Sequence, residues 1–391
     1  MPRHVPAASC VREKAVIHSA IHSDQDLRTA AWTSEGADPL FRLRASEEGS
    51  GYPSAILSER SEQSDAERAI EQSTVAHVSD GIEDRELPIA RARTVVRRIL
   101  SWYTEHARDL PWRHPDATPW AIMVSEFMLQ QTPVERVRGP WQRWLERWPT
   151  PASLAVAPPG DAVRAWGRLG YPRRALRLHQ AAQMIMNDFG GQVPEDHESL
   201  LTLPGVGPYT AAAIRSFAYG RREIVLDTNV RRLLSRLAWG VAYPSSTSTR
   251  QEQALADELA PSNAQRAARW AIASMELGAM VCRARNPICN SCPVATLCAW
   301  RRSGYPAWVG SPRRAQPYVG TDRQCRGALL AVLRASDEPI PDRDLAKAWQ
   351  DSRQRDRALA SLVQDGLVVA TGNRWSLPGL VFETLDQEAR V

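Results

Sequence analysis

Four cysteines in one short stretch constrain the fold of this 391-residue chain more than any other feature. They are spaced C-x6-C-x2-C-x5-C, and the next cysteine comes only at Cys325. Prolines and turn-forming residues between them let the chain bend, so four thiols can surround one soft metal centre. The spacing favours an iron–sulfur cluster, with zinc or unrelated thiols as alternatives, because structural zinc sites usually pair two short knuckles and only one is present. The candidate ligands are Cys282, Cys289, Cys292 and Cys298.

Charge is unevenly distributed along the chain. Residues 1–90 contain 16 acidic and 9 basic residues, a net of −7, which leaves 28 of the 44 acids and 40 of the 49 bases, a net of +12, for 91–391. A basic body favours a polyanionic partner, with generic surface charge as the alternative. No window approaches a membrane span, no signal sequence precedes Cys10, and clustered cysteines favour a reducing compartment. We therefore expect a cytoplasmic protein without a membrane partner.

Periodicity divides the chain into four segments. Residues 1–88 are rich in Ser, Glu, Asp and Ala and lack a sustained period, which predicts a disordered extension. Residues 89–302 show helical periodicity without strand alternation, which predicts an all-α body. Gly, Pro and Ser mark a linker at 303–322. Three short helical stretches and two strands in 323–391 predict a winged-helix-like segment, with a small helical adaptor as the alternative.

The string LPGVGPYTA at 203–211 has the form of a tight turn between two helices. Two glycines, Gly205 and Gly207, permit the turn, and Pro208 suits the first turn of the second helix. Backbone N–H groups at such a helix start can bind a phosphate without reading base sequence. The string therefore predicts a helix-hairpin-helix DNA-binding motif, with an αα-hairpin that binds nothing as the alternative.

Two carboxylates are candidates for catalysis. Asp227 precedes an apolar-periodic helix, where it is either a simple N-cap or an ionised group that stabilises a developing cation. Glu126 lies among apolar residues, and burial would raise its pKa and make it a proton donor near neutral pH, unless it merely pairs with an arginine. A proton donor and a separate anion are what cleavage of a glycosidic bond requires.

From about Arg91 to Trp300 the chain resembles the helix-hairpin-helix DNA glycosylases with a terminal iron–sulfur loop, and among them the MutY-type adenine DNA glycosylases. The resemblance implies a six-helix barrel at about 118–235, a cluster domain from about 89–117 plus 236–302, and a 4Fe–4S cluster on the four cysteines. Its motifs follow the family's order over some 210 residues: LPWR (110–113), SEFMLQQT (125–132), GRLGY (167–171), LPGVGPYTAAAI (203–214), LDTNVRR (226–232) and MELGAMVC (275–282).

The resemblance also implies residue roles. Glu126 would protonate the extruded adenine, Asp227 would stabilise the sugar cation, and Tyr209 would shape the active site. Contacts to the base or the DNA would come from Arg113, Gln130, Gln131, Thr132, Tyr171, Gly205, Gly207, Asn229 and Glu276. Simpler explanations remain for some of these: a solvated helix face for the two glutamines, a core aromatic for Tyr171, and a helix-surface acid for Glu276.

Lysine usage separates relatives of this fold. The chain has only two lysines, Lys14 and Lys347. Members that also cut the strand carry at the hairpin a lysine that forms a Schiff base, whereas this chain has Tyr209 there. We therefore expect a monofunctional, nucleoid-associated monomer that excises adenine opposite 8-oxoguanine or guanine from double-stranded DNA and leaves an abasic site. Residues 323–391 are too short for a NUDIX-like domain. The alternatives are a thymine or uracil mismatch glycosylase and a non-catalytic iron–sulfur DNA-binding sensor.

Overall fold

The computed structural model describes residues 89–308 and 318–380 of the chain. The extension expected at 1–88 lies outside the described residues, as do the central part of the linker and the end of the C-terminal segment. All described residues belong to one compact unit, Gln72–Val391. Within the two described ranges, no helix combines the length and apolar character needed to cross a membrane.

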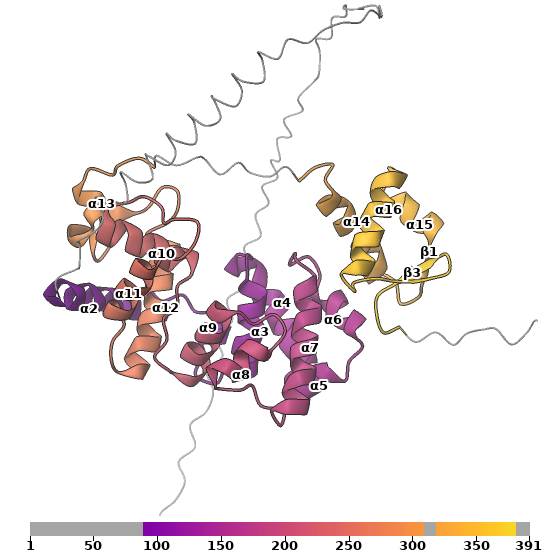
Figure 1. The fold of residues 1–391 in the computed structure, drawn as a ribbon, viewed down its shortest axis with the longest axis horizontal. Helices are drawn as coiled ribbons and strands as arrows, with labels where there is room; N and C mark the ends of the chain where they lie inside the picture. The colour runs from indigo at the N-terminus through magenta and orange to yellow at the C-terminus, as the bar shows by residue number, and fades with distance from the viewer. Residues whose placement is uncertain (1–88, 309–317, 381–391) are drawn as a thin grey trace, which may run out of the picture. The chain divides into compact units, whose positions relative to one another are not determined.

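The first apolar core surrounds a helix that is apolar on all sides, α3 (Pro119–Leu129). Thr118 caps its N-terminus, and nine of its eleven residues are buried, which is why a carboxylate in its sequence must also be buried. Figure 1 shows α3 next to α9, which follows the hairpin turn. The helices packed in this core are α3, α4 (Val134–Arg147), α5 (Pro151–Ala155), α6 (Pro159–Trp166), α7 (Arg173–Asp188), α8 (His197–Thr202) and α9 (Pro208–Tyr219).

The second core joins one helix from the start of the described chain to helices from its middle. Trp112 packs in the first core, whereas Val230 and Leu233 pack in the second. Val230 and Leu233 fall within 118–235, the range expected for the barrel, and the domain bounds stay a prediction. The helices of this core are α2 (Ile89–His106), α10 (Thr228–Leu234), a π-helical turn η2 (Ser235–Trp239), α11 (Arg250–Leu259) and α12 (Ala264–Met280).

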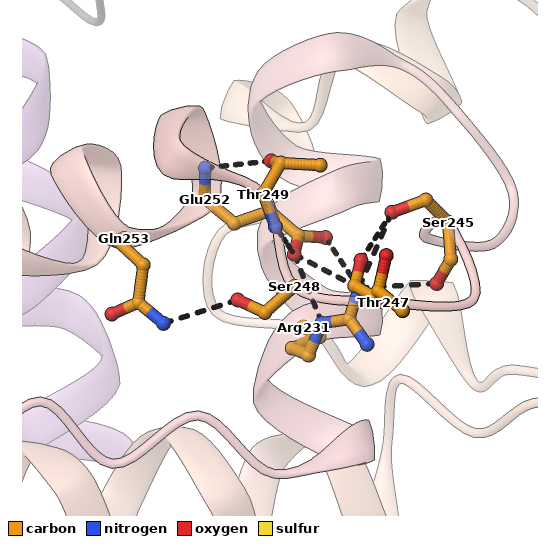
Figure 2. Close-up of polar contacts among 7 residues, drawn as sticks. All are labelled: Arg231, Ser245, Thr247, Ser248, Thr249, Glu252 and Gln253. Atoms are coloured by element: carbon orange, nitrogen blue, oxygen red, sulfur yellow. Dashed lines mark hydrogen bonds and ion pairs between the residues drawn. The ribbon is translucent and has the colours of Figure 1, made fainter.

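A buried ion pair ties α10 to α11. Arg231 Nε lies 2.9 Å from Glu252 Oε2, and Arg231 Nη2 donates to the carbonyls of Ser245 and Thr247 at 3.0 and 2.7 Å. Glu252 also completes a capping box with Thr249 at the start of α11, as Figure 2 shows. The pair holds the loop between the two helices and anchors α10, the helix whose N-cap is Asp227.

The C-terminal segment confirms the expected three helices and terminal hairpin and adds a short strand. Strand β1 pairs antiparallel with β3, with Ile340 opposite Trp375, and the sheet order is β1–β3–β2. This order of elements is that of a winged helix. The segment's core includes Val163 of α6, whose carbonyl accepts a 3.0 Å bond from Arg334 Nε. Its elements are α14 (Asp322–Arg334), β1 (Ile340–Pro341), α15 (Asp342–Ala348), α16 (Ser352–Gln364), β2 (Val369–Thr371) and β3 (Arg374–Ser376).

Candidate active site

Glu126 lies near the C-terminal end of α3, where apolar neighbours leave it 6% exposed. Burial, and next the negative charge of Asp227, raise the pKa of Glu126 to about 7. The charge of Arg113 and a hydrogen bond from Tyr209 act in the opposite direction. Glu126 is therefore half protonated near neutral pH, as a proton donor must be to act there. The simple pairing of Glu126 with an arginine does not describe this environment.

Asp227 is the N-cap of α10 and, like Glu126, lines a cavity of the protein. Its oxygens accept from Asn229 N at 2.9 Å, Val230 N at 2.7 Å and Asn229 Nδ2 at 2.6 Å. Burial nevertheless raises the pKa of Asp227, because it outweighs these three donors. The sequence analysis expected the helix N-terminus to keep the Asp227 carboxyl ionised and did not include the effect of burial on its pKa. The role of N-cap and the catalytic role are compatible, since one carboxylate can do both.

A cavity of about 620 Å³ brings the candidate groups together. Glu126, Asp227 and Tyr209 all line it, although they come from different helices. Burial raises the pKa of Tyr209 well above its usual value, so its phenol stays protonated and donates. The volume lies in the range of pockets that enclose small molecules. The lining also includes apolar side chains, among them Leu110, Trp112, Ile122, Leu129 and Met275.

An arginine–carboxylate cluster forms one wall of the cavity. Glu276 is 1% exposed, so it is not a helix-surface acid. Its oxygens accept from Arg108 Nε at 2.6 Å and Arg113 Nη2 at 2.9 Å. Burial would raise the pKa of Glu276, but these hydrogen bonds outweigh it and hold the pKa at about 2. Arg113 lines the cavity, and its buried Nη1 has no hydrogen-bond partner among the described residues.

In the hairpin between α8 and α9, only one of the two glycines has a backbone conformation that requires glycine. Gly205 has a φ of +89°, and a Cβ there would lie 2.7 Å from Phe127 Cε1. Gly207 has a φ of −108° and open space where a Cβ would stand. The backbone of the turn therefore requires glycine at Gly205, whereas Gly207 has a backbone that other residues can adopt. At Gly207 the missing side chain leaves the start of α9 open to an approaching group.

Two loops beside the hairpin contain left-handed backbone at residues other than glycine. Gln131 has a φ of +55° and Tyr171 a φ of +48°, and both side chains are exposed. Tyr171 is 53% exposed, so it is not a core aromatic. Gln130 Nε2 lies 3.4 Å from the carbonyl of Gly205, and Thr132 is buried with its hydroxyl bonded to protein groups. We call 130–132 and 167–172 the strained loops.

Comparisons with known proteins agree with this geometry. Residues 124–258 match the family model described as HhH-GPD superfamily base excision DNA repair protein. The adenine DNA glycosylase of Mycobacterium tuberculosis is 52% identical over 283 residues, which cover 72% of this chain and 92% of the relative. The chain belongs to the adenine DNA glycosylase family. It is a base-excision DNA repair N-glycosylase that binds DNA, and the expected all-α helix-hairpin-helix glycosylase fold is confirmed.

A relative of lower identity is named for another base. A thymine-DNA glycosylase of Aeropyrum pernix is 32% identical over 213 residues, which cover 54% of this chain and 95% of that protein. The solved structure of a thermostable thymine-DNA glycosylase is 28% identical, with a TM-score of 0.49, and covers 54% of this chain and 97% of that one. The 283 residues matched to the mycobacterial adenine DNA glycosylase exceed the 214 residues of 89–302, so that match extends beyond the catalytic body.

In this family member, two side chains connect the active-site carboxylate to the cysteine loop. Asn229 donates to Asp227, and its Oδ1 accepts from Arg232 Nη2 at 2.9 Å. Arg232 Nε donates to the carbonyl of Cys282 at 2.8 Å. Sequence reasoning missed Arg232, as it missed Arg108, because many arginines of this chain stand near a motif and only contacts distinguish them. The helical spacing of three residues between Asn229 and Arg232 was the one available signal.

The four cysteines line one cavity at the C-terminal end of the catalytic body. Their loop contains single turns at η3 (Cys289–Ser291) and η4 (Ala295–Leu297), followed by α13 (Ala299–Arg302). Arg236 Nη1 lies 3.5 Å from Cys282 Sγ, and its guanidinium lies 4.5 Å from the centre of the Trp300 ring. Within the described ranges no group of three or more His, Cys, Asp or Glu side chains is arranged to hold a metal ion. Four thiols that line one cavity are a donor set that both iron–sulfur clusters and structural zinc sites use.

Proposed function

We propose that this chain hydrolyses the N-glycosidic bond of adenine mispaired with 8-oxoguanine or guanine in double-stranded DNA and leaves an abasic site. The observation that carries the proposal is the meeting of Glu126 and Asp227 in one cavity in unlike environments. Glu126 lies in an apolar helix, where burial raises its pKa to about 7, whereas three N–H donors at Asp227 partly offset the burial of its charge. The 52% identity to an adenine DNA glycosylase supports adenine as the base.

In the proposed reaction Glu126 gives its proton to a ring nitrogen of the extruded adenine. The bond between that base and C1′ of the sugar breaks, and its electron pair leaves with the base. Asp227 stabilises the cation left on the sugar, and a water molecule adds to C1′ and returns a proton to Glu126. Tyr209 donates to the Glu126 carboxyl and holds it in place. Arg113, held by Glu276 and lining the cavity, would donate to an acceptor on the base from its unpartnered Nη1.

Strand cleavage is not part of the proposed activity. A lyase of this fold would need a side-chain amine that attacks C1′ and forms a Schiff base. Among the described residues the only lysine is Lys347, which lies in α15, pairs with Asp344 and does not line the cavity. The hairpin position contributes Tyr209 instead, and a phenol cannot form a Schiff base.

Three residues are proposed to contact the DNA directly: Gly207, Gln131 and Tyr171. The open backbone at Gly207 would bind a phosphate, and Gln131 and Tyr171 would enter the gap left by the flipped base. Gln130, Thr132 and Gly205 would hold these loops from within. We propose a monomer that acts at the nucleoid in the cytoplasm, with a six-helix barrel and a cluster domain as its catalytic body and a winged-helix segment after the linker.

The four cysteines are proposed to hold a 4Fe–4S cluster. The donor set is four thiols on one cavity, and Arg236 directs an N–H at the sulfur of Cys282. When bound, the cluster would cross-link the loop 282–298 through its four ligands. Its role would be structural, since hydrolysis of a glycosidic bond transfers no electrons. Arg283 and Arg285 lie exposed between the first two cysteines, where phosphates could reach them. Asn229 and Arg232 would connect this loop to Asp227.

Four duplexes test the proposal: A opposite 8-oxoguanine, A opposite G, T opposite G and U opposite G. We expect release of adenine from the first two, and strand breaks only after hot alkali. Release from only the T or U duplex would replace adenine by a pyrimidine substrate, and tight binding without release would indicate a DNA-binding sensor. Strand breaks without alkali, at the rate of base release, would contradict the monofunctional assignment.

A further inference from the structure

One buried arginine links the two strained loops. Arg174, in the first turn of α7, is 6% exposed. Its Nη1 donates to the carbonyls of Phe127 and Met128 at 2.7 and 3.2 Å and also to the carbonyl of Gln130. Its Nη2 donates to Thr132 Oγ1 and to the carbonyl of Gly170, both at 3.1 Å. A single guanidinium therefore bonds the end of α3, the loop 130–132 and the loop 167–172.

Two of the acceptors, the carbonyls of Phe127 and Met128, belong to the last turn of α3. The last carbonyls of a helix have no intrahelical donor, and a cation at this end also favours the helix dipole. All five acceptors of Arg174 are uncharged, and no ion pair of the described ranges includes it. Burial of a charge without an opposite charge is costly. The five hydrogen bonds of the Arg174 guanidinium therefore offset this cost, and they also fix its position. Its guanidinium also lies 5.4 Å from the ring centre of Tyr171.

We propose that Arg174 is a positioning residue that holds Gln131 and Tyr171 in one fixed relation, so that the two strained loops enter the DNA as a unit when the base is extruded. Left-handed backbone at residues other than glycine persists only where the surroundings impose it, and Arg174 bonds a carbonyl next to each of the two positions. The inference rests on the proposed entry of these loops into DNA. Lysine could not replace Arg174, because one ammonium cannot match the planar fork that reaches both loops.

Extrusion of the base, measured separately from its cleavage, tests this role. The Glu126→Gln background keeps the base attached, and 2-aminopurine at the target position fluoresces more strongly when it leaves the stack. We expect Arg174→Gln to reduce this fluorescence rise at least fivefold and Arg174→Lys to reduce it less. Arg173→Gln removes a charge from the neighbouring, exposed residue and should leave the rise within twofold. Equal losses in Arg173→Gln and Arg174→Gln, or full extrusion by both Arg174 variants, would overturn the proposal.

A double-mutant cycle with Tyr171→Ala distinguishes positioning from folding. In the Glu126-intact chain, Arg174→Gln should lower the single-turnover rate by about 10- to 100-fold, because small misplacements of positioning groups cost this much. In the Tyr171→Ala background the same change should cost at least threefold less than in the unchanged chain, since part of the effect of Arg174 acts through Tyr171. Additive losses would contradict the role. Thermal melting checks each fold, and Arg174→Lys carries the test if the glutamine variant does not fold.

If the intact chain releases no base from any duplex, the proposed function fails, while the fluorescence comparison still tests Arg174.

Discussion

Replacing Glu126 by glutamine should make the protein more stable in alkaline solution and, at the same time, inactive. The pKa of this carboxyl rises from an ordinary 4.5 to about 7 in the folded chain, chiefly through burial. Between these two pH values the folded state retains the proton that the unfolded state has lost. The free energy of unfolding therefore falls as pH rises from about 4.5 to about 7, and the loss is complete above that range. Glutamine has nearly the same shape and cannot ionise.

The size of the effect follows from the shift. A difference of about 2.5 pKa units at about 1.4 kcal/mol per unit corresponds to about 3 kcal/mol. We expect Glu126→Gln and the unchanged chain to unfold at similar urea concentrations near pH 4.5, and the variant to be more stable by about 3 kcal/mol at pH 8. Base release should fall about 100-fold or more, because a positioned general acid contributes at least this factor.

The assay is urea unfolding at several pH values, with Glu146→Gln as the control. Glu146 is an exposed acid on α4, so its variant should follow the unchanged chain at every pH. The rate of base release by the unchanged chain should also fall as pH rises through about 7, since the acid must be protonated to act. If the stability of Glu126→Gln and that of the unchanged chain differ by a constant amount from pH 4.5 to 8, the carboxyl is not raised and the reasoning is refuted.

Further variants test the other parts of the site. Asp227→Asn should slow single-turnover base release about 100-fold or more and leave the Kd for duplex DNA within threefold, because cation stabilisation is lost and phosphate contacts are not; a matching loss of binding would show that Asp227 mainly supports the fold. Cys292→Ser should lower the iron content of purified protein, while Cys325→Ser, at a buried cysteine of the C-terminal core, should retain it; equal iron in both would exclude the proposed ligand. Arg232→Gln should slow base release about tenfold with iron content unchanged, because it frees Asn229 beside the carboxylate, and an unchanged rate would remove Arg232 from the site.

Several features were predictable because they are local. The apolar run of α3 predicted the burial of Glu126, and a carboxylate before a periodic helix predicted the N-cap at Asp227. The first glycine of the hairpin has the positive φ that such a turn requires. Two short helices, α5 and α8, have little periodicity of their own, and the two-residue strand β1 exists only through its pairing with β3. Local caps at Thr150 and Asp196 favour the starts of the two helices, but their packing partners and the pairing of β1 lie elsewhere in the chain.

Other features depend on contacts between distant parts of the chain. Arg108 and Glu276 are 168 positions apart, and nothing near either residue in the sequence indicates that they meet. Arg174 looks like any of the 47 arginines of this chain until its five bonds are seen. The same applies to the division between the two cores, which places Val230 and Leu233 of α10 in one cluster with residues of α2 and α12.

By itself the sequence determined the helical body, the cluster of four cysteines and the chemical types of the two carboxylates, because spacing and local polarity control these features. Only the tertiary structure decided that Glu126 and Asp227 face one cavity, that burial raises the pKa of both, and that Glu276 is held at a low pKa by two arginines. The physical reason is that burial and charge act through space. Packing of the two cores against each other brings together groups that the chain keeps about a hundred residues apart.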